Sequence, residues 1–227
     1  TLWNNTITVN GTGGNNTGVY VQNSGAYITI DRTRITTNGI ANSTGVVFNN
    51  ANFSIIRFTN ISVNDNGTAE VITLGDNIGI YATNVREFTV SNNSISARGS
   101  YTKNSGLRLT DFNDTLIDGN NMTVNGSDDI YAINFRSSPS PGLSRNTRFL
   151  NNTVTVSTTL GDAAAIHDST DLALGENMTI SFNTFTIQGA TGSACLEIAY
   201  HTNSSVANNT CLMSDDDDTY GIHYTDS

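Results

Sequence analysis

The 227-residue sequence is poor in basic residues, proline and cysteine. Lys and Arg total 10 against 20 Asp and Glu, Lys103 is the only lysine, and the formal net charge is −10. This balance disfavours nucleic acids and anionic lipid surfaces as partners, because both are polyanions. No run of 18 apolar residues occurs, so no membrane-spanning helix is expected. The chain starts at Thr1 without a basic leader, which is typical of a mature or trimmed piece.

Small polar residues are abundant instead. Asn, Thr and Ser number 32, 33 and 22, which is 87 of the 227 residues, whereas charged residues make up 13%. Leu, Ile, Val and Phe together number 54, which is modest but above the level typical of a disordered chain. The composition therefore favours a folded protein with an uncharged polar surface.

Many of the asparagines lie in Asn-x-Ser/Thr tripeptides, the acceptor sites for N-glycosylation. About eight such tripeptides are expected by chance for this composition, and the sequence has 15. They begin at Asn4, Asn10, Asn15, Asn42, Asn52, Asn60, Asn66, Asn92, Asn113, Asn121, Asn125, Asn151, Asn177, Asn203 and Asn208. The excess favours a glycosylated, secreted protein. The alternative is that abundant Asn and Thr create these tripeptides as a by-product of turns and strands.

Two sequence units recur with a period of about 29 residues. The first is a small residue followed by an apolar-x-apolar triplet, at Gly18–Val21, Gly45–Phe48, Gly79–Ala82, Gly106–Leu109, Ala132–Phe135, Ala165–Asp168, Cys195–Ile198 and Gly221–Tyr224. The second is an Asn-rich turn that leads into a short strand, with apolar residues at Ile7, Ile35, Ile61, Ile95, Met122, Val154, Phe185 and Cys211. A third, weaker apolar segment lies between them, as in Ile28–Ile30 and Phe88–Val90.

Three short alternating strands in each repeat leave no room for helices. Equivalent strands of successive repeats should stack in parallel, with a right-handed return. We therefore predict an all-β fold, a single-stranded right-handed parallel β-helix of about eight coils that spans residues 1–227 as one domain. Its length would be about 38 Å at the usual spacing between strands.

One turn position of this repeat is dominated by asparagine. It is occupied by Asn5, Thr33, Thr59, Asn93, Asn120, Asn152, Asn183 and Asn209. Stacked side-chain amides at this position could hydrogen-bond from coil to coil. Asparagine also tolerates left-handed backbone conformations in turns, which would explain the preference without any ladder.

The repeat spacing and phrases such as "NNTIT" and "NNSIS" resemble the parallel β-helix repeat superfamily. This superfamily includes pectate lyases, polygalacturonases, NosD-type periplasmic proteins and many archaeal and bacterial surface proteins. The resemblance extends from Asn4 to Tyr224. It implies the fold, and the dense Asn-x-Ser/Thr tripeptides are most similar to those of secreted cell-surface members. It implies little about activity, because the shared residues are structural.

Related lyases and hydrolases place substrate along the outer face of one sheet. The middle residues of the first unit, which should face solvent there, are Tyr20, Val47, Tyr81, Arg108, Asn134, His167, Glu197 and His223. His167, Glu197 and His223 would stand on three consecutive coils, with Arg108 two coils from His167. This set could bind Zn²⁺ or transfer protons. The alternative is an ordinary exposed polar face. Asp168 falls on an inward position, either as a break in the apolar ladder or as a hydrogen-bonded buried carboxylate.

The motifs of the enzymes in this superfamily are mostly missing. Polygalacturonases carry "NTD", "DD", "GHG" and "RIK" segments, and only the acidic pair Asp128–Asp129 occurs here. No cluster of acids with a catalytic Arg or Lys, as in pectate lyases, stands out. These departures favour a protein without catalytic activity.

Two further features concern the last coil. Asp215, Asp216, Asp217 and Asp218 could bind Ca²⁺ through several carboxylates, but the absence of the EF-hand spacing favours a solvated acidic loop. No other cofactor is expected. Cys195 and Cys211 are the only cysteines, and a secreted chain favours a disulfide between them over two buried thiols.

Two functional hypotheses follow. The first is an extracellular N-glycosylated structural protein of a surface layer, adhesin or fibre. Its partners would be covalent glycans and copies of itself or neighbouring domains, because neither end of the predicted solenoid carries a cap and the chain is either a fragment or an uncapped subunit. The second is a domain that binds or cleaves polysaccharide through Arg108, His167, Glu197 and His223.

Overall fold

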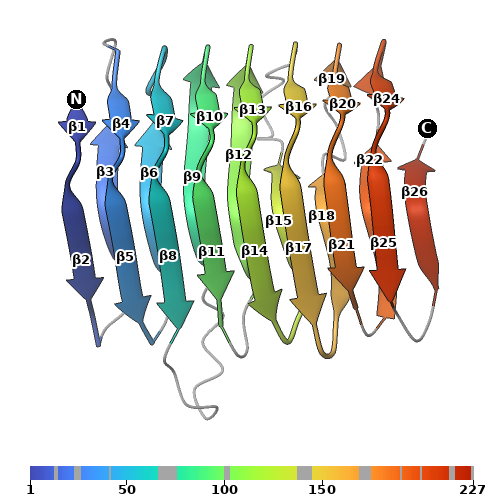
Figure 1. Ribbon diagram of the computed structural model, residues 1–227, viewed down its shortest axis with the longest axis horizontal. Helices are drawn as coiled ribbons and strands as arrows, with labels where there is room; N and C mark the ends of the chain where they lie inside the picture. Colours follow the sequence, from blue (N-terminus) through green and yellow to red (C-terminus); the bar gives the residue numbers. More distant parts are fainter. Residues whose placement is uncertain are drawn as a thin grey trace.

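The computed structural model describes residues 1–12, 15–22, 27–40, 42–65, 76–99, 103–136, 145–168, 175–189, 191–199, 201–214 and 218–225. These residues form 26 β-strands wound into a solenoid (Figure 1). They contain no helix, and hence none that is long and apolar enough to cross a membrane.

The strands form three eight-stranded parallel sheets and one small pair. Sheet 1 contains β1 (Leu2–Trp3), β4 (Thr29–Asp31), β7 (Ile55–Arg57), β10 (Thr89–Ser91), β13 (Leu116–Asp118), β16 (Arg148–Leu150), β20 (Thr179–Ser181) and β24 (Ser205–Ala207). Sheet 2 contains β2 (Thr6–Asn10), β5 (Arg34–Gly39), β8 (Asn60–Asp65), β11 (Ser94–Arg98), β14 (Asn121–Gly126), β17 (Thr153–Thr158), β21 (Thr184–Gln188) and β25 (Thr210–Ser214). Sheet 3 contains β3 (Asn16–Gln22), β6 (Ser43–Asn49), β9 (Asn77–Arg86), β12 (Ser105–Asn113), β15 (Ile130–Arg136), β18 (Asp162–Asp168), β22 (Thr191–Ala199) and β26 (Thr219–Thr225). The pair is β19 (Gly175–Glu176) with β23 (His201–Thr202).

The predicted parallel β-helix is confirmed. The second sequence unit forms sheet 2, the first unit forms sheet 3, and the weaker third segment forms sheet 1. In Figure 1 the chain descends along sheet 2 in front, returns along sheet 3 behind, and advances to the next coil, which is a right-handed path. The solenoid has about 7 turns of ~28 residues, because eight strands in a sheet are separated by seven turns.

The interior is filled by in-register ladders of apolar side chains. In sheet 2, Ile35 pairs with Ile61, and Ile61 pairs with Ile95. All three are buried. Aromatic rings continue the packing between coils, as in Phe48 and Phe88, whose ring centroids lie 5.0 Å apart. Because each inward position touches its equivalents above and below, the apolar core runs along the whole solenoid axis.

An asparagine ladder lines the corner between sheets 1 and 2. The Asn120 backbone N–H and side-chain Nδ2 both donate to Asn152 Oδ1, at 2.9 and 3.0 Å, and Asn152 Nδ2 donates to the Ile117 carbonyl at 3.0 Å. The same pattern joins Asn93 to Asn120. It continues through Asn183 and Asn209. These asparagines therefore satisfy buried backbone groups from coil to coil, as one of the two sequence interpretations held.

The left-handed backbone conformation is adopted not by the ladder asparagine but by the residue before it. This corner row consists of Asn4, Arg32, Phe58, Asn92, Gly119, Asn151, Phe182 and Asn208, with φ between 48° and 64°. Phe58 and Phe182 are unusual members, because a bulky side chain rarely adopts this conformation. Phe58 directly follows β7, which ends at Arg57.

Glycine in the first unit permits close approach of sheet 3 to sheet 2. A Cβ added at Gly79 would lie 2.4 Å from Ile95 Cγ2 and 2.5 Å from the Gly106 carbonyl oxygen. The second contact is with backbone, which cannot move aside without disturbing the next coil. This explains why the small residue recurs at this position.

Candidate functional site

The outer row of sheet 3 is in the register that the repeat predicts. Arg108 pairs with Asn134, Asn134 pairs with His167, and His167 pairs with Glu197. Glu197 in turn pairs with His223 on β26. The four candidate residues therefore stand on one row, with Asn134 between Arg108 and His167.

The expectation that this row is open to solvent is wrong in its middle part. Val47, Arg108 and Asn134 point away from the core, because their neighbours along each strand point into it. They are nevertheless only 8%, 7% and 2% exposed. Tyr20 at one end is 55% exposed, and His223 at the other end is exposed. A substrate lying along this face would not reach the Arg108 side chain.

Arg108 is held by an ion pair of its own. Its Nη1 donates to Asp76 Oδ2 at 2.6 Å, and the guanidinium is nearly buried. Burial lowers the pKa of Arg108, and the charge of Asp76 opposes that effect. Arg108 thus belongs to a separate pair and is not brought together with His167.

His167 and Glu197 form the best-defined polar pair of the row. His167 Nδ1 donates to Glu197 Oε2 at 2.6 Å, and the Tyr131 ring stacks on the imidazole with centroids 3.9 Å apart and planes at 9°. The hydrogen bond from His167 is the largest influence on Glu197 and lowers its pKa, burial opposes this, and the charges of His167 and His223 add to it. Glu197 is therefore ionised at neutral pH and can accept hydrogen bonds or a proton.

Acidic residues surround the phenol of Tyr131. Its pKa is raised, first by burial and then by the negative charges of Asp129, Glu197, Asp162 and Asp128. Asp129 also binds the only lysine, because Lys103 Nζ lies 2.7 Å from its Oδ2. The Tyr131 hydroxyl therefore stays protonated at neutral pH and is available as a hydrogen-bond donor.

His223 extends this group at one end. It stacks on Tyr220 with ring centroids 5.0 Å apart and planes at 22°. It lies on the coil next to Glu197 and contributes to the lowered pKa of that carboxyl. The face from Tyr131 to His223 thus combines two histidine–tyrosine stacks with one carboxylate.

A second histidine–carboxylate pair escaped the sequence interpretation. Asp168 lies inward at the end of β18 with its side chain 1% exposed, and His201 Nε2 donates to its Oδ2 at 2.5 Å. Asp168 is therefore the hydrogen-bonded buried carboxylate of the two alternatives. His201 could not be assigned because it falls outside the triplet pattern, on the short strand β23.

Metal-binding clusters of three or more His, Cys, Asp or Glu side chains are absent from the described residues. Of the acidic run, Asp215, Asp216 and Asp217 lie outside those residues. Asp218 is exposed, and its backbone carbonyl accepts a hydrogen bond from Ser193 N. The Ca²⁺ alternative therefore stays a prediction.

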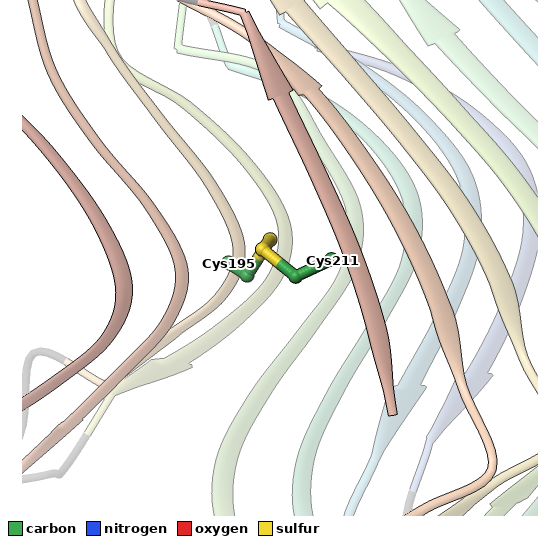
Figure 2. The surroundings of a disulfide bond; sticks show 2 residues. All are labelled: Cys195 and Cys211. Atoms are coloured by element: carbon green, nitrogen blue, oxygen red, sulfur yellow. A yellow bond between two sulfur atoms is a disulfide. The ribbon is translucent and has the colours of Figure 1, made fainter. Parts of the chain in front are cut away.

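Cys195 and Cys211 are joined by a disulfide with a Cα–Cα distance of 6.2 Å (Figure 2). Cys195 lies on β22 in sheet 3, and Cys211 lies on β25 in sheet 2. The bond therefore links two walls across the interior of one coil.

The described Asn-x-Ser/Thr asparagines are exposed or half-buried. Asn66 is outside the described residues, and none of the other 14 is buried. By contrast, the buried asparagines are Asn77, Asn93, Asn104, Asn120, Asn134, Asn152 and Asn183, and none of these seven begins an Asn-x-Ser/Thr tripeptide.

The fold has counterparts among solved structures, although no protein-family model and no curated protein sequence matches the chain. The surface protein and adhesin PfbA of Streptococcus pneumoniae superimposes with a TM-score of 0.61 at 12% identity, over 98% of this chain and 67% of that one. The A-module of the mannuronan C-5 epimerase AlgE4 of Azotobacter vinelandii gives a TM-score of 0.39 at 14% identity, over 94% and 64%. Identities this low bear on the fold alone. The chain therefore shares the parallel β-helix fold with PfbA.

Proposed function

We propose that this protein is an extracellular, N-glycosylated, non-catalytic surface protein, a subunit of a surface layer, adhesin or fibre. The observation that carries the proposal is the separation of the asparagines into two sets. None of the seven buried asparagines is an acceptor site, and none of the 14 described acceptor asparagines is buried.

Strand alternation explains how one repeat produces both sets. The residue two places after a ladder asparagine faces the core, so it is apolar, as Met122 is after Asn120. The residue two places after a corner asparagine faces out, so it can be Thr or Ser, as Thr153 is after Asn151. At the corner positions, a sugar attached to the asparagine would therefore extend away from the core.

The placement of acceptors on sheet 2 also reduces crowding between glycans. On four consecutive coils, the acceptors are Asn60, Asn92, Asn121 and Asn151. Asn92 and Asn151 occupy the corner row, while Asn60 and Asn121 each begin a strand two residues further on. Equivalent positions on neighbouring coils are about 4.8 Å apart, so this alternation separates sugars that would otherwise collide.

The proposed partners are covalent glycans and copies of the chain, or neighbouring domains, that contact the ends of the solenoid. Open sheet edges carry unpaired backbone groups that favour such stacking. The similarity to PfbA, itself described as a surface protein and adhesin, is consistent with this role at the level of the fold.

Intact-mass analysis of protein purified from its native cells tests the proposal. We expect chemical deglycosylation to lower the mass of the native protein by the mass of its attached sugars. A native protein whose mass does not change on deglycosylation would contradict the proposal. Electron microscopy of the same material would show whether the protein forms head-to-tail fibres or separate particles.

A second candidate function is favoured by the cluster around His167. A carboxylate, a protonated tyrosine hydroxyl and stacked rings on one face are groups that bind sugar hydroxyls and apolar sugar faces. In this alternative the domain binds or cleaves a polysaccharide through His167, Glu197 and His223, and Arg108 acts only through its ion pair with Asp76. Depolymerisation of alginate or pectin that is lost in H167A and E197A, and kept in the matched outer-face variant Tyr20→Ala, would establish it in place of the structural role.

A further inference from the structure

Two phenylalanines stand in the corner row between sheets 1 and 2 at an unfavourable conformation. Phe58 and Phe182 have φ values of 50° and 59°, a region that bulky side chains rarely adopt. They also leave 50% and 61% of their surfaces exposed to solvent. Asn or Gly would avoid both penalties, and these residues occupy other positions of the same row. A ligand for the two rings would account for their presence.

Each ring is followed on the next coil by an acceptor asparagine of the same row. Phe58 N donates to the Ser91 carbonyl, which immediately precedes Asn92. Phe182 N donates in the same way to the carbonyl of Ala207, which precedes Asn208. Each phenylalanine and the asparagine that follows it on the next coil have the same backbone conformation. Their side chains therefore project side by side.

The amide nitrogens of two corner asparagines, Asn92 and Asn151, turn toward the preceding coil. Asn151 Nδ2, the atom that would carry a glycan, donates to Asp118 Oδ1 of the preceding coil at 2.9 Å. Asn92 Oδ1 faces the following coil, 2.8 Å from where a Cβ on Gly119 would lie, so its Nδ2 is turned away from that coil. A sugar on Asn92 thus starts on the side of Phe58.

We propose that Phe58 and Phe182 are stacking platforms for the first sugar of the glycans on Asn92 and Asn208. This inference rests on the proposed glycosylation and adds a binding role for specific side chains. The ligand class is a pyranose whose axial C–H bonds form an apolar face. Stacking that face on an exposed phenyl ring removes apolar area of both partners from water.

The surroundings of Phe58 fit this role. The guanidinium of Arg32, on the preceding coil, lies 5.4 Å from the centre of the ring. The side of Phe58 toward Asn92 is therefore the one left for a sugar. Asn151 provides an internal control, because the preceding coil has Gly119 in place of an aromatic residue.

Proton NMR of the glycosylated protein, trimmed enzymatically to one N-acetylglucosamine at each site, tests the proposal. We expect upfield ring-current displacement of the sugar protons on Asn92 and Asn208, and none on Asn151. Phe58→Leu should abolish the displacement at Asn92 only, and Phe182→Leu that at Asn208 only. Glycosylated sites whose sugar protons match those on Asn151 would overturn this inference and leave the proposed function intact. Absence of sugar from all sites would overturn both.

Thermal unfolding provides a second test. If Phe182 had only a structural role, its replacement would change Tm equally with and without a glycan on Asn208. Thr210→Ala removes the acceptor site at Asn208 without changing Phe182. We expect Phe182→Leu to lower Tm by about 2–4 °C when Asn208 is glycosylated and to have little effect in the Thr210→Ala background. Equal effects of Phe182→Leu in both backgrounds would contradict stacking.

Discussion

Replacement of Asn120 by alanine should destabilise the fold strongly, because Asn120 occupies the middle of the buried ladder. Its Oδ1 accepts from Asn93 N and Asn93 Nδ2, both at 3.0 Å. Its Nδ2 donates to the carbonyls of Val90 and Asp118, at 2.9 and 3.2 Å, and to Asn152 Oδ1 at 3.0 Å. Asn120 is 1% exposed, so water cannot replace these bonds without entering the core.

The magnitude follows from the groups that lose their ladder partner. The Asn93 backbone N–H loses its ladder partner, while Asn93 Nδ2 still donates to the Ile56 carbonyl. The Val90 carbonyl loses one of its hydrogen bonds but stays in the β10–β13 ladder. A buried polar group left without a partner costs about 1–3 kcal/mol, so the orphaned Asn93 N–H predicts a loss of about 1–3 kcal/mol in the free energy of unfolding.

Urea unfolding of the unglycosylated protein, followed by circular dichroism, measures this loss. Asn121→Ala is the matched control, because Asn121 adjoins Asn120 but is exposed on the outer face, and its replacement should change the free energy of unfolding by less than about 0.5 kcal/mol. A loss for Asn120→Ala as small as that for Asn121→Ala, at an unchanged m-value, would refute the ladder as a source of stability.

Three further predictions concern other parts of the solenoid. Reduction of the Cys195–Cys211 disulfide, which spans 16 residues, should lower the free energy of unfolding by about 3 kcal/mol, and equal urea midpoints with and without reductant would contradict this. The pKa of Glu197 is lower in the folded protein than in the unfolded chain. Its ionised form therefore stabilises the fold at any pH above the ordinary pKa of a glutamate. Glu197→Gln should therefore cost up to about 1 kcal/mol at pH 7, and the difference from wild type should vanish as the pH falls below about 4; a difference that grows in acid would refute it. Gly79→Ala should lower Tm because its Cβ would meet backbone, whereas Gly221→Ala, with nothing within 4 Å, should not, and equal Tm values for the two variants would disprove the packing argument.

The fold could be predicted from the sequence because every coil repeats the same physical requirements. A core only a few side chains wide needs one apolar residue at each inward position, and the pairing of Ile35 with Ile61 follows from their equal place in the repeat. A single chain could therefore be aligned with itself, and the ladder positions from Asn93 to Asn209 were found in this way.

The candidate site was predicted less well because its environment depends on neighbours outside the repeat. The alternation of β12 indicates that Arg108 points away from the core, which is correct, but its burial beside Asp76 depends on chain segments that do not follow the period. The same holds for His201, whose bond to Asp168 joins residues 33 positions apart that share no motif. The stacking of Tyr131 on His167 likewise lies between two different rows of sheet 3.

Site-resolved mass spectrometry of the native protein tests the central claim most directly. Enzymatic release of N-glycans in H₂¹⁸O would mark every occupied asparagine as ¹⁸O-labelled aspartate. We expect label at surface acceptors such as Asn92, Asn151 and Asn208, and none at the ladder asparagines Asn93 and Asn152. Peptides that cover the acceptor sites and carry neither label nor sugar would contradict the proposal that this solenoid is a glycosylated surface protein.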